Sequence, residues 1–143
     1  MNNQIEFLIL GLKTEQFAIF EEGFSEKKKS ELITNIDFKA NQKANQIGVF
    51  ATFTFEQAKK PVIKLEISCH FGIESNSWDN CKLDNKIIFP KDFMIHLAMI
   101  TIGSARGVLH AKTEGTNLNK IVLPTIDIRK LVQKDIEFSF TNN

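Results

Sequence analysis

The stretch PVIKLEISCHFGIE, residues 61–74, carries an apolar side chain at every second position. In an extended chain, one face would hold Ile63, Leu65, Ile67, Cys69, Phe71 and Ile73, and the other Lys64, Glu66, Ser68 and His70. A period of two is typical of a strand with one face against the core and the other in water. The segment therefore predicts one strand of an antiparallel sheet.

The residues before this stretch extend the prediction. Residues 47–55 alternate in the same way, and the polar connector 56–61, which ends in Pro61, is suited to a hairpin loop. Residues 31–39 place apolar side chains on one side, whereas residues 4–12 are apolar on both faces. We expect all four segments to be strands.

The apolar period changes after Pro90, and residues 91–113 predict a long helix. This helix is apolar almost all round, with a narrow polar stripe formed by Asp92, His96, Arg106 and His110. A small sheet can cover only one side of such a helix, so we expect a second copy of the chain to cover the other. Glycines in the stripe would let two helices approach closely. The predicted oligomer interface comprises Leu97, Ile100, Gly103, Ser104, Gly107 and Ala111.

Two smaller expectations concern the end of the long helix and the segment that follows it. Arg106 should be partly buried and paired with Asp92 or Glu114 of the same or a neighbouring subunit. After a loop over 114–119, residues 121–126 should be extended, because Pro124 excludes them from the middle of a sheet. Asp127 can cap a short helix over 128–134.

Length and composition limit the classes of protein. The 143 residues predict one domain, 1–143. The net charge of +1 gives no field that would hold nucleic acid or an anionic membrane, and the apolar stretch 93–105 is too short for membrane insertion. The first residues lack the features of a signal peptide, and the two cysteines predict reduced thiols. We expect a cytoplasmic protein.

The sequence predicts no catalytic residue, no metal site and no cofactor. Cys69 and His70 are neighbours on a strand and point to opposite faces, and His96 and His110 lie about 21 Å apart along one helix. No motif flanks either cysteine, and the chain has no glycine-rich phosphate loop and no His-Glu-x-x-His. An enzyme is therefore the least favoured class.

The run SARGVLHAKTEGTNLNKIVLPTID, residues 104–127, resembles the end of the SecB family of protein-export chaperones. That family ends its long helix with an arginine-containing stretch, turns at a Gly-Thr pair and continues through a Leu-x-Pro-x-Asn/Asp segment into a second helix. The order of the upstream strands agrees, so the resemblance covers about residues 31–132. It implies an α+β fold: a four-stranded antiparallel sheet with one long helix and a short C-terminal helix, assembled as a dimer of dimers.

The resemblance also implies a function: ATP-independent binding of unfolded or precursor polypeptides in apolar grooves of a homotetramer. Exposed apolar side chains that folding does not use would line these grooves. The candidate residues are Phe17, Phe20, Phe24, Leu32, Ile36, Phe38, Leu123, Ile126, Ile128 and Leu131. Export members of the family are strongly acidic and dock the motor protein SecA, so the net charge of +1 argues against SecA as a partner. The alternative is an adaptor of the same fold dedicated to one partner, such as an antitoxin or an envelope-assembly protein.

Overall fold

The computed structural model describes residues 4–140, so the two ends of the predicted 1–143 domain lie outside the described residues. Its main feature is a four-stranded antiparallel sheet in the order β1-β4-β3-β2. The strands are β1 (Phe7–Ile19), β2 (Glu31–Asn41), β3 (Gln46–Gln57) and β4 (Lys60–Ile73). All four predicted strands are confirmed, and β1 continues seven residues beyond the predicted end at residue 12.

Register places the alternating side chains of β4 as the sequence predicts. Leu65, Ile67 and Cys69 lie opposite Phe53, Ala51 and Val49 of β3, and all six side chains are buried. In place of the predicted connector 56–61, a two-residue loop, Ala58 and Lys59, joins β3 to β4, and Pro61 belongs to β4. Both loop residues have positive φ, as a type I′ hairpin requires. The alternating apolar side chains of β3 and β4 thus lie on one face of the sheet.

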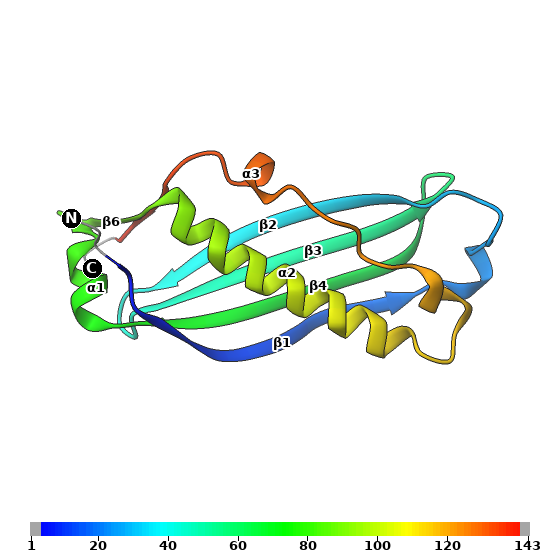
Figure 1. Cartoon of the computed structure of the whole chain (residues 1–143), viewed down its shortest axis with the longest axis horizontal. Coiled ribbons are helices and arrows are strands. Elements are labelled where there is room, and N and C mark those ends of the chain that lie inside the picture. The colour runs from blue at the N-terminus through cyan, green and yellow to red at the C-terminus, as the bar shows by residue number, and fades with distance from the viewer. Residues whose placement is uncertain (1–3, 141–143) are drawn as a thin grey trace.

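The long helix α2 (Lys91–Thr113) covers that buried face and packs on β3 and β4 (Figure 1). Its bounds confirm the predicted helix. Met94, Leu97, Ala98, Ile102, Ala105 and Leu109 are the buried apolar side chains that it contributes to the core. The helix has the length and composition of a membrane span, and 44% of its most apolar window is buried within the structure.

The connection between β4 and α2 was not predicted as regular structure. It forms the short helix α1 (Ser75–Asn80) and the strands β5 (Lys82–Leu83) and β6 (Lys86–Phe89). Strand β6 also pairs with β7 (Ile136–Ser139), which gives a second sheet in the order β5-β6-β7. Trp78 of α1 packs edge-on against Phe89 of β6 at a centroid distance of 5.5 Å. This second sheet extends the core at one end of the main sheet.

The remaining elements are short. The 3₁₀ helix η1 (Glu21–Gly23) follows β1, and η2 (Asn117–Lys120) follows α2. Residues 121–126, predicted to be extended, belong to no helix or strand, and Ile121 has extended backbone. They lead through Asp127 into α3 (Ile128–Leu131), which contacts α2. The side chain of Asp127 accepts a hydrogen bond from the backbone N–H of Arg129, which confirms the predicted cap. The helix that it begins is three residues shorter than predicted.

Candidate functional site

The largest run of exposed apolar side chains lies on β1, an edge strand of the main sheet. Leu8, Ile9, Leu10 and Leu12 are 59%, 55%, 48% and 47% exposed. Ile9 lies opposite Phe71 on the helix-covered face, and Leu8 lies opposite Gly72 on the open face, so both faces of this edge are apolar. The sequence signal was the apolar character of both faces of residues 4–12. Sequence reasoning did not select these residues as a site, because only the strand order shows that β1 has no neighbour on its outer side.

The predicted polypeptide-binding residues fall into three groups. Phe20 and Leu131 are exposed, at 43% and 41%, whereas Leu123 and Ile128 are only 2% and 9% exposed and belong to the core. The prediction is therefore wrong for Leu123 and Ile128, since their side chains are already packed within the chain. The half-buried group comprises Phe17, Phe24, Leu32, Ile36, Phe38 and Ile126.

The structure brings only part of this set together. Leu32, Ile36 and Phe38 form a row along the helix-covered side of β2, the second edge of the sheet. Phe17 lies on β1, at the opposite edge, where the Lys112 ammonium sits 5.6 Å from the centre of its ring. The candidate set thus divides between two edges of the sheet.

The structure leaves only part of the predicted helix interface open to a partner. Leu97 faces the sheet and is fully buried, so it is not available to a partner, and its inclusion in the interface was wrong. Ile100 and Ser104 are half-buried, and Gly103, Gly107 and Ala111 are exposed. A Cβ atom added at Gly103 or Gly107 would have no neighbour within 4 Å. The outward stripe of α2 is therefore open and lined by small side chains.

Arg106 has a different partner from the one predicted. Its Nε donates to the carbonyl oxygen of Leu123 at 3.0 Å and its terminal nitrogen to that of Pro124 at 2.9 Å. The guanidinium therefore binds main-chain carbonyls instead of Asp92 or Glu114. These two bonds fix the extended segment 121–127 against α2.

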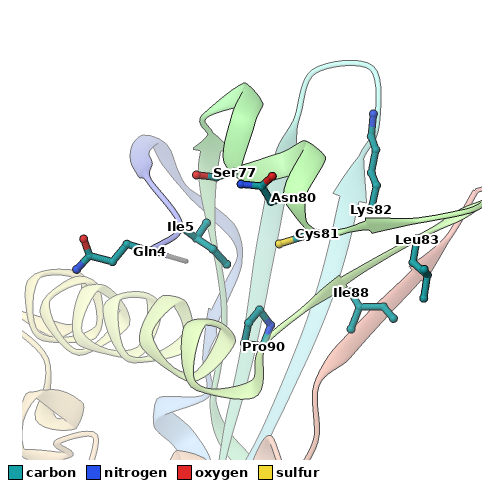
Figure 2. A pocket seen from close by; sticks show the side chains of 9 residues that line it. All are labelled: Gln4, Ile5, Ser77, Asn80, Cys81, Lys82, Leu83, Ile88 and Pro90. Atoms are coloured by element: carbon teal, nitrogen blue, oxygen red, sulfur yellow. The ribbon is translucent and has the colours of Figure 1, made fainter. Parts of the chain in front are cut away.

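A separate cavity of about 280 Å³ lies at the end of the molecule that carries α1 and the hairpin of β5 and β6 (Figure 2). Its walls are Gln4, Ile5, Ser77, Asn80, Cys81, Lys82, Leu83, Ile88 and Pro90. Burial raises the pKa of the Cys81 thiol, which lowers its reactivity as a nucleophile. No histidine, aspartate or glutamate lines this cavity to act as a general base for the thiol. Within residues 4–140, no group of three or more histidine, cysteine, aspartate or glutamate side chains could hold a metal ion.

Comparison with known proteins finds likeness only at the level of structure. No family model and no curated protein matches the chain. One similar solved structure is the SecB-like chaperone Rv1957 of Mycobacterium tuberculosis in complex with a ChAD peptide from the antitoxin Rv1956 HigA1. The likeness has a TM-score of 0.48 and 11% identity over 87% of this chain and 90% of that one. Another is a protein of unknown function from Streptococcus agalactiae, with a TM-score of 0.42 and 15% identity over 85% and 99%. Neither likeness is close enough to assign the chain to a family.

Proposed function

We propose that this protein is a cytosolic, ATP-independent holdase that binds unfolded or precursor polypeptides on apolar surface and works as a homotetramer, a dimer of dimers. The observation that carries the proposal is apolar surface that one chain leaves uncovered: Leu8, Ile9, Leu10 and Leu12 at the edge of β1 are each about half exposed, and Phe20 and Leu131 are 43% and 41% exposed. Contiguous exposed apolar area of this kind is typical of surfaces that bind protein. The proposal involves no catalytic step and no cofactor.

Two open surfaces support assembly from identical copies. The edge of β1 has unpaired backbone groups and apolar side chains on both faces, so pairing with another strand would bury both. At Gly103 and Gly107 on the outward stripe of α2, an added Cβ would meet no atom within 4 Å, so a second helix could approach closely there. Two different contact surfaces are what a dimer of dimers needs.

Polypeptide capture would then use the apolar side chains that remain outside these contacts. Phe20 and Leu131 are exposed, and Leu32, Ile36 and Phe38 are incompletely covered along β2. A bound segment would gain about 25 cal/mol for each Å² of apolar area that it buries. Affinity should therefore increase with the length of the apolar segment, with little dependence on its order of residues.

The test is suppression of aggregation of a chemically unfolded client protein, without ATP, at near-stoichiometric amounts of the oligomer. We expect suppression by the wild-type protein and weaker suppression by the double variant Phe20→Ser, Leu131→Ser. The matched control is Val122→Ser, which removes an exposed apolar side chain, 67% exposed, outside the proposed surface. Far-ultraviolet circular dichroism of each variant shows whether it is folded. Absence of suppression by the folded wild-type protein at large molar excess would refute the holdase function.

The near-neutral charge favours a second candidate, an adaptor dedicated to one partner, such as an antitoxin or an envelope-assembly protein. Export by way of SecA is the less favoured role, because the net charge is +1 rather than strongly negative. Two unrelated unfolded clients distinguish the candidates. A general holdase protects both from aggregation, whereas a dedicated adaptor protects neither and binds one folded or unfolded partner tightly.

A further inference from the structure

The open face of the main sheet, opposite α2, carries a hydrogen-bonded trio of side chains. Ser68 Oγ lies 2.6 Å from Glu15 Oε1 and 2.9 Å from His70 Nε2. Glu15 lies in β1 at a shift of register between Thr14 and Gln16. Although it is on the uncovered face, Ser68 is fully buried. The three side chains therefore link β1 to β4 by hydrogen bonds.

The proton count of the trio determines the orientation of the imidazole. A serine hydroxyl has one proton, and an ionised carboxylate can only accept, so the short contact assigns the Ser68 proton to Glu15. His70 Nε2 must then donate to the Ser68 oxygen. The second ring nitrogen, Nδ1, is left with a free lone pair when the ring is neutral. The bond to Ser68 thus fixes the orientation of the imidazole ring, with Nδ1 on the side away from Ser68 Oγ.

This nitrogen borders a hollow of about 200 Å³ above Gly48. A Cβ atom at position 48 would lie 2.9 Å from the Phe50 ring and 3.5 Å from His70 Nδ1. Gly48 is not among the residues with positive φ, so its backbone does not require glycine. Glycine at this position leaves the space beside Nδ1 free of a side chain.

Two hydrogen-bond donors lie on the rim of the same hollow. Lys39 places its ammonium 4.4 Å from the centre of the Phe50 ring and forms no ion pair with any residue of 4–140. Asn41 Oδ1 accepts from the backbone N–H groups of Lys43 and Ala44, which leaves its amide NH₂ free to donate. The hollow therefore combines a cation, an amide donor and an imidazole nitrogen.

We propose that the hollow above Gly48 binds the carboxylate of an acidic side chain from a partner polypeptide, with uptake of one proton by His70. A carboxylate fits better than a carboxamide, because in an open hollow neutral hydrogen bonds contribute little and charge-assisted bonds contribute more. Once protonated, Nδ1 becomes a donor beside Lys39 and Asn41. The site is on the face opposite α2 and does not depend on the proposed holdase function.

The charged side chains around the hollow link carboxylate binding to protonation of His70. The charged residues on the strands beside His70 include Lys13 and Glu15 on β1 and Asp37 and Lys39 on β2, and Glu66 and Glu74 lie four residues from it along β4 and just past its end. Negative groups outnumber positive ones in this region, so a carboxylate is repelled less when His70 carries a proton. Binding should therefore strengthen as the pH falls through the range in which histidine titrates, about pH 8 to 5.

The test follows the ring resonances of the three histidines by NMR in protein with isotope-labelled histidine. The probes are a blocked Ala-Glu-Ala tripeptide and the matched Ala-Gln-Ala tripeptide, at constant ionic strength. We expect the glutamate peptide alone to move the midpoint of the His70 titration to higher pH, and to bind at least about tenfold more tightly near pH 5.5 than near pH 8. His96 and His110 serve as internal controls on the same chain.

Two variants complete the test. Lys39→Gln should reduce the effect of the glutamate peptide on His70, and Gly48→Ala should also reduce it, because the added Cβ would lie 3.5 Å from His70 Nδ1. Unchanged His96 and His110 resonances would show that each variant is folded. The proposal is overturned if the glutamate peptide leaves His70 unaffected in the wild-type protein, if all three histidines respond equally, or if the glutamine peptide acts as strongly.

Discussion

Gln57 and Ser25 are joined by a reciprocal pair of hydrogen bonds. Gln57 Oε1 accepts from the Ser25 backbone N–H at 2.9 Å, and Gln57 Nε2 donates to the Ser25 carbonyl at 3.0 Å. The same Nε2 also reaches Lys28 O and Ser30 Oγ. One buried amide at the end of β3 thus holds the loop that connects β1 to β2.

Substitution of Gln57 by leucine should therefore lower the free energy of unfolding by about 2 kcal/mol, because it removes the four hydrogen bonds that this buried amide makes to the loop. Urea denaturation measures the change. Gln42→Leu, in an exposed turn, is the control and should be close to neutral. Equal stability of Gln57→Leu and the wild-type protein would contradict the buried role of the amide.

Replacement of Arg106 by methionine should lower the free energy of unfolding by about 1 kcal/mol, because two main-chain carbonyls lose a charged donor. Hydrogen exchange should accelerate in residues 121–126 before it does in the sheet. The same change at Arg129, an exposed residue of α3, is the control. Uniform acceleration over the whole chain would argue against a local clamp.

The loop between β3 and β4 offers a stabilising change. Ala58 and Lys59 have φ of 51° and 63°, a conformation that asparagine and glycine adopt at lower cost. The double variant Ala58→Asn, Lys59→Gly should therefore raise the free energy of unfolding by about 1 kcal/mol. Thermal and urea denaturation should both show an increase in stability. A loss of stability would mean that the side chains of Ala58 and Lys59 contribute to the fold.

Glu74 links the stability of α1 to pH. Its carboxylate accepts from the backbone N–H groups of Asn76 and Ser77 at 3.0 and 2.9 Å, and these bonds lower the pKa of Glu74 below its usual value of 4.5. A lowered pKa means that the contribution to stability is complete above pH 4.5 and is lost as the pH falls below it. Glu74→Gln should melt earlier than the wild-type protein at neutral pH, and the difference should shrink in acid. Glu22→Gln, in η1, is the control; a difference independent of pH would exclude the charge as the cause.

Assembly can be examined through the two open surfaces. Analytical ultracentrifugation of the wild-type protein should give a mass above the 16.3 kDa of one chain. Leu10→Lys should reduce this mass by disrupting the β1 edge, and Gly107→Leu should reduce it by separating the helix stripes. Val122→Lys changes an exposed apolar residue outside both surfaces and should leave the mass unchanged. A wild-type monomer would remove the basis for both contacts.

The sequence by itself determined the main elements of the fold. Alternation in β2, β3 and β4, the hairpin before Pro61 and the change of period after Pro90 were sufficient, because these patterns reflect which side of each element is buried. The cap at Asp127 was also local and was predicted correctly. Helix α1 and the strands β5, β6 and β7 were not predicted, since elements of two to six residues have too few positions to show a period.

Only the tertiary structure decided which apolar residues are available to a partner. Leu97, Leu123 and Ile128 carry the same pattern as their neighbours, yet they are packed inside the chain. Ile9 and Leu12 lie on the helix-covered face but are exposed, because β1 lies at the edge of the sheet. The contact of Glu15 with Ser68 joins residues 53 positions apart through a shift of register in β1. The spacing of apolar residues shows which face of a single helix or strand is apolar. Exposure and side-chain partners depend on which other element covers that face, and this is a property of the assembled fold.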